Sequence, residues 1–203
     1  MRLFDGGRAP NPRRVRVFLA EKGIEVPIVP VDMGQMEHRS PEIARRNPLR
    51  RLPVLELDDG TVLTESVAIC RYFEELHPEP VLFGKGALGR ARVEMWNRRM
   101  ELNFLGCVAA AFRHLHPAMR EWEVPQVAEW GEANKPKALE FLRLVDGELA
   151  TREFIAGDAY SVADITGLIA VQFMKPARIA MPDDLSNVAR WYAAVSARPS
   201  ATA

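Results

Sequence analysis

Asn47–Phe73, NPLRRLPVLELDDGTVLTESVAICRYF, has the pattern of a β-hairpin that leads into a helix. Two short apolar segments, Val54–Leu57 and Thr61–Leu63, flank an Asp-Asp-Gly sequence, which is a strong signal for a tight turn between antiparallel strands. From Ile69 to Leu76 the apolar residues recur at i, i+3, i+4 and i+7, the spacing of one helix face. The stretch therefore predicts a β-β-α unit.

The chain before this stretch alternates short strands and helices. Arg2–Phe4 and Val26–Val31 are predicted strands because they are short and rich in apolar residues, and Ser40–Arg46 is a predicted short helix that Asn-Pro ends. A further helix between the first two strands completes the order β-α-β-α-β-β-α within roughly 80 residues, which predicts a small sheet with helices packed on it.

That first helix follows the Gly- and Pro-rich loop Asp5–Pro12. We expect Asn11 to be its N-cap and Pro12 its first helical residue, because an Asn side chain accepts hydrogen bonds from helix N–H groups and Pro suits the first position. Val15, Phe18 and Leu19 have the i, i+3, i+4 spacing of one helix face, and Gly23 is expected to end the helix.

The rest of the chain has a helical pattern. Beyond the stiff segment His77–Pro80, the apolar spacing predicts helices at 87–116, 124–150, 161–175 and 185–197. Ser161 and Asp164 have the spacing of a capping box with Asp in place of Glu, and this pair is interpreted as a helix cap rather than a catalytic pair. The predicted organisation is an α/β domain at 1–78, a linker at 79–86 and an all-α domain at 87–203.

Composition limits the classes of partner. Lys and Arg total 27 residues, as do Asp and Glu, so the 203-residue chain has no formal net charge, and no nucleic-acid partner is expected. No apolar segment approaches the ~18 residues of a membrane span, so we expect no membrane partner and a cytoplasmic location. The two cysteines, Cys70 and Cys107, do not form a Cys-x-x-Cys pair, and neither a disulfide nor a metal site is expected.

The order of these elements resembles that of a cytosolic glutathione transferase of bacterial type. Three motifs carry the resemblance, which spans essentially the whole chain: PNPRRVRVFLAEKG at 10–23, the stretch 47–73, and FIAGDAYSVADITGLIA at 154–170. The resemblance implies a thioredoxin-like first domain, glutathione as a co-substrate without a metal, and a homodimer.

The resemblance also implies residues that bind glutathione. Pro53 matches the family's cis-proline, which turns the backbone of Leu52 toward the peptide-like part of glutathione. Glu65 and Ser66 match the residues that meet the ammonium and the carboxylate of the γ-glutamyl end, where a helix N-terminus also favours an anion. From the residues alone, a trans proline at a strand edge and ordinary helix capping are open alternatives.

The glycine end of glutathione carries a second carboxylate, which needs a cation. His38 matches the family's position for this role, and Arg51, directly before Leu52, is a second candidate. As an alternative, both are exposed loop residues without a ligand.

Glutathione transferases lower the pKa of the bound thiol, most of them with a Ser or Tyr hydroxyl and some with a Cys. Here the usual position of that residue falls at Ala9, which has no polar side chain. The nearest side-chain donor is Asn11, whose amide has two N–H donors and one acceptor oxygen. We therefore expect Asn11 both to cap the helix and to stabilise the thiolate, with a modest transferase activity.

Six residues are expected to line the electrophile site: Ala9, Phe104, Phe112, Arg113, His116 and Trp122. For the aromatic residues, burial in a helical core is the alternative. The expected function is a glutathione S-transferase that conjugates glutathione to small hydrophobic electrophiles, with glutathione peroxidase activity towards organic hydroperoxides as a companion activity. The alternative is a non-catalytic ligand-binding or interaction protein of the same fold. A thiol reductase is disfavoured because no Cys precedes Cys70.

Overall fold

The computed structural model describes residues 1–203, which divide into two compact units. The first unit comprises Met1–Val81 together with Pro199–Ala203, and the second comprises Leu82–Arg198. The expected all-α domain at 87–203 differs from this division at its end, because the C-terminal residues belong to the first unit.

A four-stranded sheet organises the first unit. Its strands are β1 (Arg2–Asp5), β2 (Ile28–Pro30), β3 (Val54–Glu56) and β4 (Val62–Thr64), in the order β2-β1-β3-β4. β1 is parallel to β2 and antiparallel to β3, and β3 is antiparallel to β4. β2 is shorter than the strand predicted at Val26–Val31. The antiparallel pairing of β3 and β4 confirms the predicted hairpin.

The register of the sheet brings four chain segments to one edge. Phe4 lies opposite both Val29 and Val54, and Val54 lies opposite Thr64. The ends of β1, β2 and β4 and the beginning of β3 are consequently at the same edge of the sheet, which we call the loop edge.

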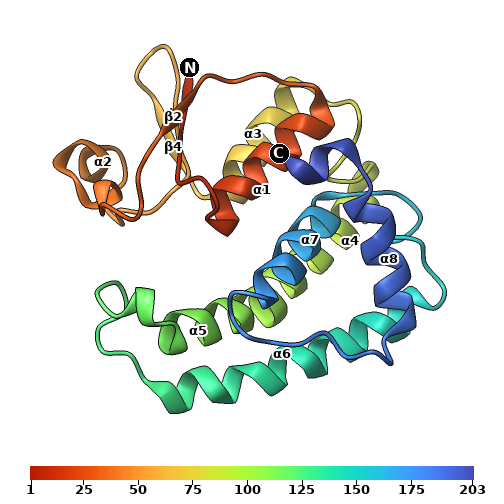
Figure 1. Ribbon diagram of the computed structural model, residues 1–203. Coiled ribbons are helices and arrows are strands. Elements are labelled where there is room, and N and C mark those ends of the chain that lie inside the picture. The colour runs from red at the N-terminus through yellow and green to blue at the C-terminus, as the bar shows by residue number, and fades with distance from the viewer. The chain divides into compact units, whose positions relative to one another are not determined.

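Helices complete the first unit. They are α1 (Pro10–Lys22), α2 (Pro41–Arg46) and α3 (Ser66–Leu76), with the short 3-10 helices η1 (Glu37–Arg39) and η4 (Pro199–Thr202). Figure 1 shows α1 and α3 side by side, and these two helices are in contact. Because strand side chains alternate between faces, Phe4 and Val54 join the buried cluster around Ile43 of α2, whereas Leu3 and Leu55 point to the opposite face.

Helix α1 begins earlier than the sequence predicted. Its N-cap is Ala9, whose C=O accepts a hydrogen bond from the N–H of Arg13 at 3.2 Å, and Pro10 is the first helical residue. The prediction that Asn11 is the N-cap is wrong, because Pro10 already has the fixed φ that suits the first helical position. At the other end, Gly23 has a φ of 64° and ends the helix as predicted.

The second unit is helical throughout. Its helices are α4 (Gly86–Arg99), α5 (Gly106–Leu115), α6 (Ala128–Leu149), α7 (Val162–Met174) and α8 (Ser186–Ser196), with a π-helical segment η2 (Met100–Leu105) and a 3-10 helix η3 (Pro117–Met119). α4, η2 and α5 follow one another directly, so the single helix predicted at 87–116 contains a π-helical segment. α7 is almost entirely buried and contacts α4, α5 and α8 (Figure 1).

The beginning of α7 has the capping box that the sequence predicted. Oδ2 of Asp164 accepts hydrogen bonds from the backbone N–H of Ser161 at 2.9 Å and from its hydroxyl at 3.0 Å. Oδ1 accepts from the N–H of Ile155 at 2.8 Å and from Nε1 of Trp191 at 2.9 Å. Asp164 thus joins three segments of the helical unit, and burial raises its pKa to about 6 although these four donors oppose the rise.

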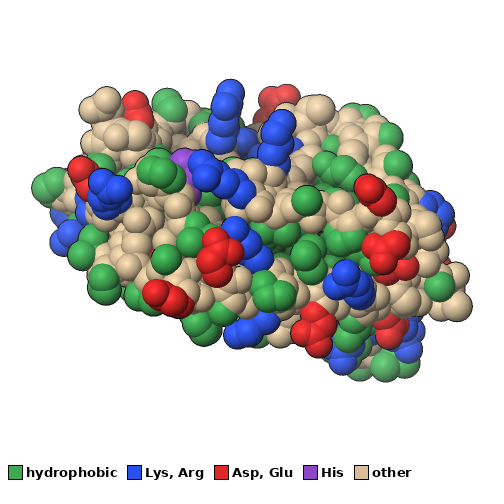
Figure 2. Space-filling model, turned by 60° about the horizontal axis from the view of Figure 1, so that its bottom comes forward, with side chains coloured by type: hydrophobic (Ala, Val, Ile, Leu, Met, Phe, Trp, Pro, Cys, Tyr) green, Lys and Arg blue, Asp and Glu red, His purple; other side chains and the backbone are tan.

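The distribution of charged side chains on the surface agrees with the balanced composition of the chain. Figure 2 shows Lys and Arg side chains interspersed with Asp and Glu over the face in view, as expected for a chain with equal numbers of both signs. None of the helices combines the length and the apolar character that crossing a bilayer requires.

Candidate functional site

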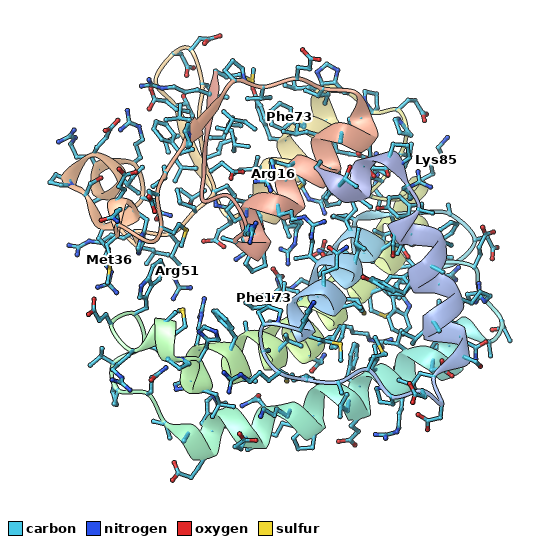
Figure 3. All side chains as sticks on the ribbon, in the orientation of Figure 1. Arg16, Met36, Arg51, Phe73, Lys85 and Phe173 are labelled. Atoms are coloured by element: carbon cyan, nitrogen blue, oxygen red, sulfur yellow. The ribbon has the colours of Figure 1, made fainter.

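The loop edge of the sheet gathers the predicted site residues of the first unit. Ala9 and Asn11 follow β1, His38 follows β2, and Arg51, Leu52 and Pro53 precede β3, while Glu65 and Ser66 follow β4. Since the ends of β1, β2 and β4 and the start of β3 share this edge, four segments that are far apart in the sequence converge there. Figure 3 shows Met36 and Arg51 at the end of this unit that carries α2.

The loop after β1 is held by an ion pair that the sequence analysis missed. Asp5 is 3% exposed, and its carboxylate accepts hydrogen bonds from Nη1 of Arg16 at 2.6 and 2.7 Å and from the N–H of Gly7 at 2.5 Å. The same Arg16 nitrogen donates to the C=O of Gly7 at 3.0 Å. Arg16 lies on α1 (Figure 3), so the pair fixes the loop between β1 and α1 at both of its ends.

Gly6 brings this loop against the segment before β3. A Cβ atom on Gly6 would lie 2.4 Å from Sδ of Met33, which would have to move, and 3.2 Å from Cδ1 of Leu52, which is a tight contact. The absence of a side chain at Gly6 therefore allows the β1–α1 loop to lie close to the side chains of Met33 and Leu52.

The peptide bond between Leu52 and Pro53 is cis, as the resemblance implied. The segment before it is held by Asn47, which is 3% exposed. Nδ2 of Asn47 donates to the C=O of Arg51 at 2.8 Å, and Oδ1 accepts from the N–H of Leu49 at 3.0 Å. Both ends of one buried amide thus shape the loop that leads into the cis peptide.

Glu65 and Ser66 form the junction between β4 and α3. Glu65 has a φ of 65°, which is unusual for a residue with a side chain, and such backbone strain is concentrated at functional sites. Ser66 is the first residue of α3 and is 5% exposed, and its hydroxyl accepts a hydrogen bond from Nη1 of Arg14 at 3.0 Å. The N–H groups in the first turn of α3 have no partner within the helix, so this junction suits an anionic group.

The first turn of α1 offers fewer donors than an ordinary helix N-terminus. Pro10 and Pro12 have no N–H, and the N–H of Arg13 is bonded to Ala9, so Asn11 carries the remaining backbone donor of this turn. The Asn11 side chain is exposed and does not cap the helix. Asn11 can therefore direct both its backbone N–H and its side-chain amide toward a ligand.

The two candidates for the glycine carboxylate differ in charge. His38 is 4% exposed, and burial, aided by the nearby positive charge of Arg39, lowers its pKa. His38 is then neutral at pH 7 and can offer an N–H donor but no charge. Arg51 is exposed and keeps its positive charge, so it is the stronger electrostatic partner for a carboxylate.

In the helical unit, two of the predicted pocket residues lie together. Phe112 stacks on His116 with ring centroids 4.7 Å apart and contacts Phe173 of α7 at 4.9 Å. Phe112 and His116 line a hollow of about 160 Å³ between α5, α6 and the segment after α7. Nδ1 of His116 accepts a hydrogen bond from the N–H of Ala118 at 3.2 Å, which fixes the ring at the rim.

The other predicted pocket residues lie elsewhere. Phe104 is completely buried in the core of the helical unit and does not line the hollow. Arg113 and Trp122 are half-buried and do not line the hollow, and Ala9 belongs to the first unit. A second hollow of about 400 Å³, which the sequence analysis missed, lies at the end of α7 and is lined by Val171, Met174, Lys175 and Arg178–Met181.

Comparison with known proteins decides the family. The profile of the glutathione S-transferase N-terminal domain matches residues 9–76, and that of the C-terminal domain matches residues 95–199. Glutathione S-transferase 2 of Saccharomyces cerevisiae is 36% identical over 98% of this chain and 87% of its own length. The chain belongs to the glutathione S-transferase family.

Solved structures of other members of the glutathione S-transferase family agree with this assignment. The crystal structure of Gtt2 from Saccharomyces cerevisiae superposes with a TM-score of 0.95 at 36% identity, covering 100% of this chain and 99% of that one. A Gtt2-class glutathione S-transferase of Vibrio parahaemolyticus gives a TM-score of 0.87 at 39% identity, covering 98% and 95% of the two chains. The predicted fold, a thioredoxin-like α/β unit followed by an all-helical unit, is confirmed for this member of the family.

Proposed function

We propose that the chain is a cytoplasmic, homodimeric glutathione S-transferase that binds glutathione at the loop edge and conjugates it, through its thiol sulfur, to small hydrophobic electrophiles. The observation that carries the proposal is the convergence of the cis Leu52-Pro53 peptide with the strained Glu65-Ser66 junction at one edge of the sheet. Together they match two parts of a γ-glutamyl peptide: its extended middle needs backbone partners, and the α-carboxylate at its γ-glutamyl end needs donors at a helix N-terminus.

Each part of glutathione has a proposed partner. The γ-glutamyl carboxylate binds at the hydroxyl and N–H of Ser66, and its ammonium binds at Glu65. The peptide-like middle pairs with the backbone of Leu52. Arg51 supplies the charge for the glycine carboxylate, and neutral His38 supplies an N–H donor for it.

Asn11 is the proposed catalytic residue. A free thiol with a pKa near 8.5 is only a few per cent ionised at pH 7, and lowering that pKa by about two units requires roughly 2.7 kcal/mol of preferential thiolate stabilisation. Asn11 brings two donors, its backbone N–H and its amide, and the positive end of the α1 dipole adds to them. The thiolate then attacks the carbon of the electrophile, the new C–S bond forms, and the leaving group departs with the electron pair.

The helical unit is proposed to bind the electrophile. Phe112 and His116 present stacked ring faces in the hollow between α5 and α6, which suits a small aromatic or aliphatic group. Substitution of Phe112 by Ala is expected to raise the KM for a hydrophobic electrophile without changing the affinity for glutathione.

One observation favours a second function, glutathione binding without catalysis. The first turn of α1 has two prolines and no hydroxyl side chain, so few donors are available to the sulfur. A ligand-binding protein would bind glutathione with the thiol protonated, whereas a transferase would bind it as the thiolate.

The absorbance of the bound thiolate separates the two functions. Titration of the glutathione complex from pH 5 to 9 is expected to give a thiol pKa well below the free value, and Asn11→Ala is expected to raise it and to lower kcat with an activated aryl chloride. Asn103→Ala, an exposed Asn of the helical unit, is the matched control and should change neither quantity. An unchanged thiol pKa in the wild-type complex would favour the binding protein, and absence of glutathione binding at millimolar concentration would contradict both functions.

A further inference from the structure

Arg14 is the completely buried arginine of the first unit. It lies on α1, and its exposed fraction is 0%. A guanidinium cannot lose its proton in a protein, and arginine is almost never fully buried unless it is paired. Its position therefore calls for a role beyond packing.

The partner shown for Arg14 is a residue of the proposed glutathione site. Nη1 of Arg14 donates to the hydroxyl oxygen of Ser66 at 3.0 Å, across the contact between α1 and α3 (Figure 1). Further along α3, Cys70 and Glu74 are also buried and follow Ser66 at intervals of four residues, so the three share one helix face. The positive charge of Arg14 opposes the rise in the pKa of Cys70 that burial causes, which places the guanidinium near this face.

A second buried cation in the same contact, Lys22, pairs with Glu74. Nζ of Lys22, on α1, lies 2.5 Å from the Glu74 carboxylate and donates to the C=O groups of His77 and Pro80. Lys22 therefore joins the ends of α1 and α3 that are remote from Ser66. Lys22 thus lies at one end of the contact between α1 and α3, where it pairs with Glu74. Arg14 lies toward the other end, where it donates to Ser66 of the proposed ligand-binding junction.

The hydrogen bond from Arg14 determines how the Ser66 hydroxyl can bind a ligand. A serine hydroxyl has one hydrogen to donate and accepts with its lone pairs. Because the lone pair of Ser66 accepts from Arg14, the hydroxyl hydrogen is directed elsewhere, and the adjacent positive charge makes it a stronger donor.

The geometry points to Arg14 as a positioning residue that orients and polarises the Ser66 hydroxyl for the γ-glutamyl α-carboxylate. The inference rests on the proposed glutathione site and deepens it, since it makes the affinity for glutathione depend on the negative charge of the γ-glutamyl α-carboxylate. A guanidinium held in a low-dielectric contact also interacts more strongly with a nearby anion than an exposed one does.

The test compares glutathione with an analogue whose γ-glutamyl α-carboxylate is a carboxamide. The ratio of the two Kd values, measured by calorimetry, reports how strongly the protein selects the carboxylate. Arg14→Gln is expected to reduce this ratio about tenfold, the size of a lost charged hydrogen bond. In the Ser66→Ala background the same substitution is expected to change the ratio less than about twofold, because Arg14 acts through Ser66.

Lys22→Gln is the matched control, because it removes a buried cation from the same contact. It should lower the unfolding midpoint and leave the ratio unchanged. An equal loss of affinity for both peptides in Arg14→Gln, or the same loss with and without Ser66, would overturn the inference. Should Arg14→Gln fail to fold, Arg14→Lys decides: its shorter, non-planar donor should lower the ratio at least about threefold, and an unchanged ratio would overturn the inference. Absence of glutathione binding by the wild type would instead contradict the proposed function.

Discussion

Arg16 holds Asp5 through one guanidinium nitrogen that lies 2.6 and 2.7 Å from the two carboxylate oxygens. The pair also binds the N–H and the C=O of Gly7, so it determines the course of the loop between β1 and α1. Since this loop leads directly to Ala9 and Asn11, the position of the proposed thiolate donors depends on an ion pair that touches no substrate.

Asp5→Asn is expected to destabilise the protein by on the order of 3 kcal/mol, because it leaves Arg16 partly buried without its counter-charge. It is also expected to raise the thiol pKa of bound glutathione, because the donors at Asn11 lose their fixed position. Urea unfolding and thiolate absorbance measure the two effects. Arg2→Gln breaks the more exposed Arg2–Glu56 pair of the same sheet and should cost no more than about 1 kcal/mol. Equal effects of both substitutions would contradict the prediction.

Asn47→Asp is expected to weaken glutathione binding several-fold. The carboxylate still accepts a hydrogen bond from the N–H of Leu49 but has no donor for the C=O of Arg51. The hydrogen bond that holds Arg51, just before the cis peptide, is therefore lost. Calorimetry with glutathione measures the change, and the thermal midpoint should fall at the same time. A variant that binds glutathione as tightly as the wild type would show that this loop does not shape the site.

The buried Asp164 carboxyl is expected to make stability depend on pH in an unusual direction. Its ordinary pKa of 3.8 is raised to about 6 by burial, so between pH 4 and 6 the folded protein holds this proton while the unfolded chain releases it. The contribution of Asp164 is therefore fully present below pH 4, declines as the pH rises to about 6, and is constant above, with a total of roughly 3 kcal/mol.

Urea unfolding of the wild type and of Asp164→Asn across this range measures that decline. The difference in the free energy of unfolding between the two proteins should become smaller as the pH rises from 4 to 6. If Asp164→Asn does not fold, NMR titration of the wild-type carboxyl carbon gives the pKa directly. A value near 4 would refute the prediction.

The proposed homodimer has a candidate surface on α4 and the π-helical segment. Leu88, Met95 and Leu102 recur at intervals of seven residues and are 70%, 41% and 58% exposed. Leu102→Lys is expected to convert a dimer into a monomer, as light scattering would show, whereas Leu144→Lys, at an exposed leucine of α6, should leave the dimer intact. A monomeric wild type would contradict the homodimer itself.

Local signals in the sequence determined the elements and many of the site positions. The Asp-Asp-Gly turn, the αL glycine at Gly23 and the capping box at Ser161 each depend on residues close in the chain, and all three have the predicted structure. The resemblance to the family also predicted the cis Leu52-Pro53 bond, which the structure has. The Asn11 cap was wrong because a second proline, Pro10, competes for the same helix start.

Only the tertiary structure decided which groups meet at the site. Arg14 and Ser66 are 52 positions apart, and Asp5 and Arg16 lie on different elements, so no periodicity in the sequence could pair them. The pKa of His38 is lowered mainly by burial, which is a property of the packed unit, and only secondarily by its chain neighbour Arg39. Short-range hydrogen bonding and side-chain spacing thus determine the elements, whereas the register of the sheet and the contact between α1 and α3 determine the chemistry at its edge.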